Sequence, residues 1–196
     1  VITLARVLRE SGKTVTNIVL MGMGEPFHNY DNTLGALYIL NDAQGMNIGA
    51  RRFTISTVGL VGHIERFTSE HHQMNLAISL HAADDATRSA LLPINRKHNI
   101  SNLLDACYAY TKSSGRRISF EWALIANQND DPITAHKLAR LLKGMLCHVN
   151  LIPLNPTANS SLKAPSRERV EEFRAILEEN GIPASVRVRR GIDIMA

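Results

Sequence analysis

Short runs rich in β-branched and aromatic residues alternate with helical patterns along this chain, and no other feature constrains its fold more. The starts of these runs recur about every 30–35 residues on average, the length of one strand and the helix that follows it. Such units place parallel strands in one sheet and join them by right-handed crossovers. We expect six strands, which begin near Thr16, Arg52, Met74, Arg117, His148 and Ser185.

The apolar pattern within these runs indicates how the sheet is covered. Four of the runs are dense in Ile, Val, Leu and Phe on both faces, as expected of strands covered on both sides. In the last run, Val186 and Val188 alternate with Arg187 and Arg189. This alternation predicts a half-exposed strand at an edge of the sheet.

Four helices are predicted from the residues at their ends. They would begin at Asp31, Ser101, Asp131 and Ser166, which are residue types that cap helix N-termini. Pro132 directly follows Asp131, and proline is favoured at the first helical position. The glycines expected at or beyond the helix ends are Gly45, Gly115, Gly144 and Gly181.

The pattern therefore predicts the α/β class but leaves three architectures open. A closed eight-stranded barrel needs about 250 residues, and this chain has 196. A partial barrel, a truncated full barrel and a doubly wound sheet all fit the periodicity. No linker rich in Pro or Ser divides the chain, so we expect one domain over residues 1–196, with a long surface loop at 153–166.

Composition excludes several classes of protein. Apolar residues make up 44% of the chain, which is enough for a core, and no apolar run approaches the ~18 residues of a membrane span. Two cysteines are too few for a secreted disulfide framework, so we expect a cytoplasmic protein. The net charge of +4 permits a nucleic-acid partner without establishing one.

Both ends of the sequence look cut. The chain begins at Val1 with a helical pattern instead of a leader, and it stops at RRGIDIMA without a polar tail. We therefore expect a piece of a longer protein.

The loops that follow the strands contain the residues most suited to bind a ligand, because parallel α/β folds bind ligands at the carboxyl ends of their strands. These segments are Gly22–Pro26, Ser56–Gly59, Ser79–Ala82, Glu121 and Asn155-Pro156. Glycines, hydroxyls, an amide, carboxylates and an imidazole suit a polar small molecule with ribose and amino-acid groups. Each segment also has a purely structural explanation, and these alternatives stay open. The glycines could form a tight turn, the hydroxyls could bond to strand ends, the histidine could be buried in the core, and Asn155-Pro156 could form a turn.

Other motifs are weaker. No GxGxxG, P-loop, nucleophile elbow or Cys/His spacing typical of a metal site is present. Cys107 lies on the apolar face of a predicted helix and is expected in the core. The pairs Arg51-Arg52 and Arg116-Arg117 stand at strand starts, opposite the expected site. The arginines nearest the site end of the last strand, and so the better candidates for RNA phosphates, are Arg187, Arg189 and Arg190.

Four of these segments together resemble a known family. They are TNIVLMGMGEPFHNYDN (16–32), RRFTISTVGLV (51–61), LAISLHAADDATRSALLPIN (76–95) and VNLIPLNP (149–156). In this order they resemble the bacterial radical S-adenosylmethionine (SAM) methyltransferases that methylate adenine C2 in 23S rRNA and tRNA. The resemblance covers essentially the whole chain.

The resemblance implies a partial (β/α)6 barrel, similar to a TIM barrel, whose first strand lies before Val1. It implies that Gly24 and Glu25 contact the methionine amino group of SAM. The other residues expected to hold SAM are Ser56, Ser79, Leu80, His81 and Asn155. The family's [4Fe-4S] cluster is bound by a CxxxCxxC loop that precedes Val1, and its methyl-carrying cysteine would follow Ala196. No catalytic residue or metal ligand is therefore assigned within residues 1–196.

The resemblance also implies partners for the longer protein, namely 23S rRNA, tRNA and an electron donor. It implies that the methyl group is transferred through a methyl-cysteine intermediate. We expect a monomer that does not bind a membrane. Because the cluster ligands and the methyl-carrying cysteine are missing, we expect residues 1–196 alone to be inactive. Two alternatives remain: the antibiotic-resistance branch, which methylates adenine C8, and a non-catalytic module that binds RNA or SAM.

Overall fold

The computed structural model describes residues 3, 7–8, 10–155 and 162–187. Its centre is a sheet of six parallel strands in the order β1-β2-β3-β4-β5-β6, so every strand lies beside its neighbour in sequence. Their bounds are β1 Ile18–Leu20, β2 Phe53–Thr57, β3 Asn75–Ser79, β4 Ile118–Leu124, β5 Cys147–Pro153 and β6 Ala184–Val186. All six predicted strands are confirmed.

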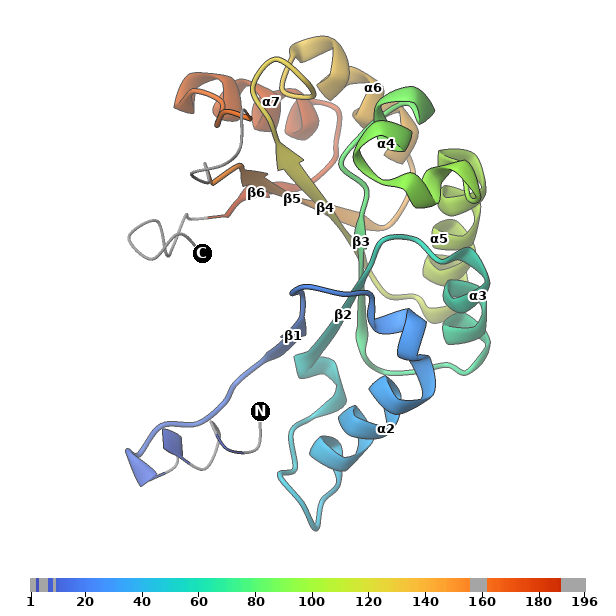
Figure 1. Ribbon diagram of the computed structural model, residues 1–196, viewed down its shortest axis with the longest axis vertical. Helices are drawn as coiled ribbons and strands as arrows, with labels where there is room; N and C mark the ends of the chain where they lie inside the picture. Colours follow the sequence, from blue (N-terminus) through green and yellow to red (C-terminus); the bar gives the residue numbers. More distant parts are fainter. Residues whose placement is uncertain (1–2, 4–6, 9, 156–161, 188–196) are drawn as a thin grey trace.

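Helices follow the strands and cover one side of the sheet. Their bounds are α2 Tyr30–Asn41, α3 Val61–Ser69, α4 Asp85–Leu91, α5 Ile100–Ser114, α6 Pro132–Leu142 and α7 Arg167–Glu179, with short 3₁₀ turns η1 Pro26–Asn29, η2 Ala50–Arg52 and η3 Pro93–Arg96. Figure 1 shows the sheet curving like part of a barrel wall, with these helices on its convex side. Sequential strand order and helices on one side exclude the doubly wound sheet, whereas a partial barrel and a truncated full barrel share both features. A six-stranded barrel whose first strand precedes Val1 would leave five strands here, whereas the described residues form six. A strand before Val1 would therefore be a seventh, and it stays a prediction.

The expectation that four strands are apolar on both faces was wrong. Side chains that face the helices are apolar and buried, among them Phe53, Ile55 and Phe120. Alternate positions face the concave side and are small or polar, namely Thr54, Ser56, Ser79, Ser119, Glu121, Asn150 and Ser185. The reason is that helices cover the convex face alone, so the concave face is free to carry polar groups.

The edge strand and the amino ends of the strands match the sequence predictions. Within the described residues, β6 pairs with β5 alone, and Val186 packs against the core while Arg187 is exposed. Val188, Arg189 and Arg190 lie outside the described residues. The two basic pairs immediately precede β2 and β4, at the amino ends of these strands. In the described part of the chain, no helix is both long and apolar enough to cross a bilayer.

Two of the four predicted helix starts are correct. Asp131 and Ser166 are the N-caps of α6 and α7, where their side chains accept hydrogen bonds from the main-chain N–H groups of Thr134 and Arg169. The other two starts were predicted two residues late. Asn29 precedes α2, which ends at Asn41, before Gly45, and the side chain of Asn99 caps α5.

Asp31 therefore lies in the first turn of α2, where its carboxylate forms an exposed ion pair with Arg66. Ser101 is likewise a residue of the first turn of α5. Gly115 does terminate α5, in the left-handed conformation with φ of 61°. Neither α3 nor α4 was predicted, because each is shorter than the windows in which helical periodicity is visible.

Candidate functional site

The loops after β1 and β2 are joined through Glu25. Its carboxylate accepts a hydrogen bond from Phe27 N–H at 3.0 Å and another from Val58 N–H at 2.7 Å. The first bond caps η1 and fixes the turn that follows Gly22–Gly24. The second spans 33 residues of sequence and holds the end of β2 against that turn. Glu25 is therefore fixed in position by main-chain donors from two loops.

Gly24 lies in a conformation that favours glycine. Its φ of 101° is in the positive region that side chains rarely adopt, and a Cβ atom there would meet no atom within 4 Å. Conformation, not crowding, therefore accounts for the glycine. Met23 beside it is fully exposed, so this loop presents its backbone to solvent.

His81 is held in a fixed orientation at the end of β3. Its Nδ1 accepts a hydrogen bond from Ala123 N–H at 2.9 Å, and its carbonyl accepts one from the Asn129 side-chain amide at 2.9 Å. Burial, together with the nearby positive charge of Arg88, lowers the pKa of His81 to about 4. The imidazole is therefore neutral near pH 7, with its proton on Nε2 and available to a ligand. The structural alternative of a buried, hydrogen-bonded histidine is also met by this geometry.

Ser56 and Ser79 lie on the concave face of β2 and β3. Neither hydroxyl makes a hydrogen bond to another described residue, although Ser56 is only 7% exposed. Hydroxyls of this kind are available to bind a ligand. Leu80 differs, because its side chain is fully buried and its N–H donates to the carbonyl of Glu121 at 3.1 Å.

Asn155 lies two residues beyond β5 and is half-buried. The adjacent Leu154 N–H donates to the carbonyl of Leu124 at 3.0 Å, which places this segment beside the carboxyl end of β4. The seven residues predicted to hold SAM thus all lie at the carboxyl edge of the sheet. Direct hydrogen bonds join the segment after β1 to the segment after β2, and the segment after β4 to the segment after β3. Residues 156–161 lie outside the described part of the chain.

Glu121 is a buried carboxylate on the concave face. It is 4% exposed, and its Oε1 accepts a hydrogen bond from Asn150 Nδ2 at 2.8 Å, while Asn150 Oδ1 accepts one from Ser185 Oγ at 3.0 Å. Strand pairing places Ser79, Glu121, Asn150 and Ser185 at one level across β3–β6. Burial raises the pKa of Glu121, partly offset by the hydrogen bond from Asn150 and the charge of Arg187.

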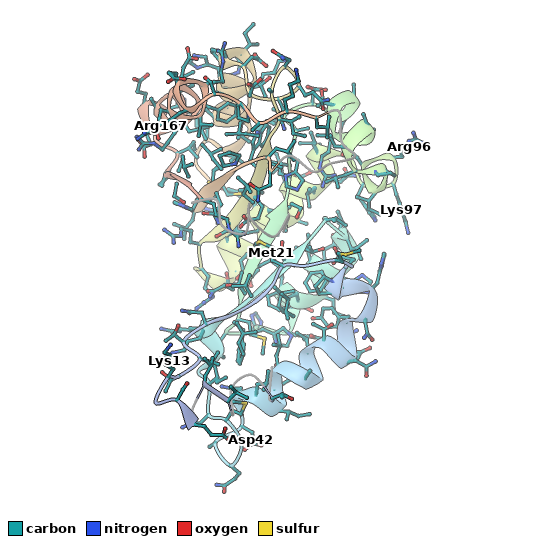
Figure 2. All side chains as sticks on the ribbon, turned by 60° about the vertical axis from the view of Figure 1, so that its left-hand side comes forward. Lys13, Met21, Asp42, Arg96, Lys97 and Arg167 are labelled. Atoms are coloured by element: carbon teal, nitrogen blue, oxygen red, sulfur yellow. The ribbon has the colours of Figure 1, made fainter. Side chains whose placement is uncertain are left out.

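Glu121, Asn150 and Ser185 face a cavity of about 450 Å³, whereas Ser79 is not part of its lining. Its lining comprises Val19, Met21, Thr54, Ser119, Glu121, Asn150, Ser185 and Arg187. Arg187 reaches from the β6 side to β1, where its Nη1 lies 3.3 Å from Met21 Sδ. Figure 2, turned toward the concave side, shows Met21 near the middle of the molecule, whereas Arg96 and Lys97 point outward from η3. The cavity therefore lies between the two edges of the sheet.

Arg88 lies beside these loops, and the sequence analysis did not single it out. It is a completely buried arginine on α4 whose guanidinium donates to main-chain carbonyls in the segments that follow β2 and β3. Arginine is seldom fully buried. Arg88 lies in a helix, whereas the sequence analysis considered the loops that follow the strands. Burial lowers the pKa of Arg88 to about 10, so it remains charged near neutral pH.

The described residues were also searched for side chains that could bind a metal ion. In the described ranges, no group of three or more His, Cys, Asp and Glu side chains could hold an ion. Cys107 is fully buried in α5, as predicted, and burial raises its pKa. Cys147 begins β5 at the amino end of the sheet, away from the site loops, and burial raises its pKa to about 11.

Residues 1–139 match the sequence model described as the Radical SAM superfamily, which is more than half of the chain. The chain belongs to the radical SAM superfamily. A solved radical SAM methyltransferase from Sphaerobacter thermophilus has the same architecture, with a TM-score of 0.96 and 53% identity over 98% of this chain and 57% of that one. The expected family resemblance and the radical SAM partial barrel are both confirmed.

Curated relatives narrow the resemblance within the radical SAM superfamily. The dual-specificity RNA methyltransferase RlmN of Sorangium cellulosum is 50% identical over all of this chain and 50% of its own length. RlmN 1 of Myxococcus xanthus is 50% identical over 97% of this chain and 53% of its own length. This radical SAM chain thus spans about half the length of the curated relatives it matches.

A more distant structure shows the fold alone. A domain of a pyruvate-formate lyase-activating enzyme from Bacteroides vulgatus has a TM-score of 0.64 at 17% identity, over 89% of this chain and all of that domain. The partial barrel of this radical SAM chain is therefore shared well beyond the RNA methyltransferases.

Proposed function

We propose that residues 1–196 form one core barrel of a radical SAM methyltransferase that methylates C2 of an adenine in 23S rRNA and tRNA through a methyl-cysteine intermediate. The observation that carries the proposal is about 50% identity to dual-specificity RNA methyltransferases along the entire chain. In support, the segments that carry the family resemblance contain β1, β2, β3 and β5, which are strands of one parallel sheet, and the residues expected to hold SAM lie near the carboxyl ends of these strands.

The described residues fit SAM. Ser56 and Ser79 have hydroxyls that bind nothing else in the described part of the chain, and His81 has an Nε2–H to donate. In our proposal these groups, with Gly24, Glu25, Leu80 and Asn155, hold the polar atoms of SAM. SAM supplies the methyl group and, when reduced at an iron–sulfur cluster, the radical chemistry. The chain's own part is to bind, orient and exclude water.

The described residues do not fit the [4Fe-4S] cluster, since Cys107 and Cys147 are buried and no metal-binding group is present among the described residues. We therefore place its ligands outside this segment and derive no step through it. We further propose that the intact protein is a cytoplasmic monomer that needs an electron donor and binds RNA with a mildly basic surface, in line with the net charge of +4 of residues 1–196.

Analysis of the RNA product tests this function. The full-length protein, reconstituted with its cluster, would be incubated with SAM, a reductant and either 23S rRNA or tRNA, and the nucleosides would be separated by mass spectrometry. We expect 2-methyladenosine in both RNAs. 8-Methyladenosine would overturn the C2 assignment in favour of the antibiotic-resistance branch, and no methylated adenosine would favour a non-catalytic binding module.

A further inference from the structure

The Arg88 guanidinium connects two of the loops that form the candidate site. Nη2 donates to the carbonyl of Val58 at 2.7 Å and to that of Ser79 at 3.3 Å, and Nε donates to the carbonyl of Leu80 at 3.2 Å. Val58 follows β2, Ser79 is the last residue of β3, and Leu80 follows it. One side chain thus fixes the spacing of two neighbouring strand ends.

A second layer of polar groups holds Arg88 itself. Its Nη1 donates to Asn95 Oδ1 at 2.9 Å. The amide group of Asn95 donates in turn to Asp85 Oδ1 and Ser89 Oγ, both at 2.9 Å. Asp85 Oδ1 also accepts the N–H of Ile100, the first residue of α5. The guanidinium is therefore anchored to α4, η3 and α5.

The backbone around Arg88 leaves room for it. Gly59 has a φ of 103°, and a Cβ atom at this position would lie 2.9 Å from Leu103 Cδ1 and 3.3 Å from Arg88 Nη2. A larger residue at position 59 would therefore press on the guanidinium and on α5. Glycine is needed here both for its conformation and for the close approach of the loop.

A role in filling the core does not account for this arrangement. Within the described residues, Arg88 forms no ion pair at contact distance, and its hydrogen bonds go to three main-chain carbonyls and one amide. Burying such a cation is costly unless its donors are satisfied. Here three of the four hydrogen bonds go to the strand ends that carry the candidate ligand-binding groups, and the fourth goes to Asn95.

We propose that Arg88 is a positioning residue for the cofactor site, which sets the spacing between the loop after β2 and the Ser79–His81 segment. It touches no ligand. It acts by keeping the Ser56 and Ser79 hydroxyls and the His81 imidazole in register with one another. The ligand part of this inference rests on the proposed function, whereas the ordering of the two loops does not.

Hydrogen–deuterium exchange on the 196-residue protein, combined with calorimetric titration of S-adenosylhomocysteine, tests the inference. Arg88→Lys keeps the charge and folds more readily than Arg88→Met, but an ammonium group has three donors and cannot serve four acceptors, of which three lie in the two loops and one in η3. We expect the amides of residues 57–60 and 79–83 to exchange about tenfold faster, and the ligand to bind about tenfold more weakly, in Arg88→Lys.

Leu177→Ala is the control, because Leu177 is fully buried in α7, whose main contacts are with α6, β5 and β6. Its exchange should rise in α7, and not in the two loops. Unchanged loop exchange in Arg88→Lys would overturn the inference, as would faster exchange with unchanged ligand affinity. If wild-type 1–196 fails to bind S-adenosylhomocysteine, the ligand part of this inference is overturned, whereas the proposed function is decided by the RNA products of the full-length protein. The exchange comparison still decides whether Arg88 orders the loops.

Discussion

At the scale of single residues, Glu25 is the link between two loops of the site. Glu25→Gln keeps the shape but offers one oxygen, so either Phe27 N–H or Val58 N–H loses its acceptor and faces an amide group. We expect the free energy of unfolding to fall by about 1–3 kcal/mol, measured by urea denaturation.

The matched control for this change is Glu65→Gln. Glu65 is an exposed residue of α3 with no hydrogen bond to another described residue, and its change should stay within about 0.5 kcal/mol. Equal effects of the two substitutions would contradict the role of Glu25 as a link between the loops.

His81 predicts a dependence of stability on pH. Its pKa is lowered to about 4 in the folded protein, so the unfolded chain, with a pKa near 6.5, binds the proton more readily. The contribution of neutral His81 to the free energy of unfolding is fully present above about pH 6.5 and is lost as the pH falls toward 4. Over this range the free energy of unfolding changes by up to about 1.4 kcal/mol per pH unit.

His81→Asn isolates this contribution. Asparagine does not titrate, tolerates the φ of 58° at this position, and places an oxygen where Nδ1 accepts the Ala123 N–H. Urea midpoints measured from pH 8 to pH 4 should fall less steeply in the variant. Parallel curves for the two proteins would contradict the buried, neutral state of His81.

The rule that parallel sheets bind ligands beyond their carboxyl ends selected the loop residues from sequence alone. It could not find Arg88, because the acceptors of this arginine are main-chain carbonyls 8 to 30 residues away. Such contacts leave no local pattern in a sequence. The same reason explains why the fixed orientation of Glu25, which depends on Val58 N–H, was not predicted.

At the scale of secondary-structure elements, the N-cap of α6 contributes measurably to the free energy of unfolding. Asp131 accepts the N–H of Thr134 at 3.0 Å and also the Thr134 hydroxyl at 2.6 Å. Asp131→Ala should lower the free energy of unfolding by about 1 kcal/mol. Asp105→Ala, at an exposed position within α5, removes the same group without a cap and should have less than half that effect in the same urea titration.

Helices that begin with a clear N-cap residue could be predicted from the sequence, whereas other helix starts could not. Asp131-Pro132 and Ser166 stood directly before their helices, whereas Asn29 and Asn99 were overlooked in favour of Asp31 and Ser101 two residues later. The faces of the strands were misjudged for a different reason. Alternation is hard to see in strands of three to seven residues, and the open concave side only became evident from the curvature of the sheet.

At the scale of the whole molecule, the chain holds the carboxyl-edge loops but no metal-binding group among its described residues. We therefore expect purified 1–196 to form no methylated adenosine when it is supplied with SAM, a reductant and RNA. Mass spectrometry of the RNA nucleosides measures this directly, with the full-length protein as the positive control. Detectable 2-methyladenosine from 1–196 alone would contradict the expectation.

The central claim is that the segments at the carboxyl ends of β1, β2, β3 and β5 hold SAM. Its most direct test is the titration of ¹⁵N-labelled 1–196 with S-adenosylhomocysteine, followed by NMR chemical shifts of the backbone amides. The account predicts saturable shifts confined to residues 22–26, 56–59, 79–82 and the end of β5. Shifts that cluster on the convex helices instead, or no saturable shift at millimolar ligand, would contradict it.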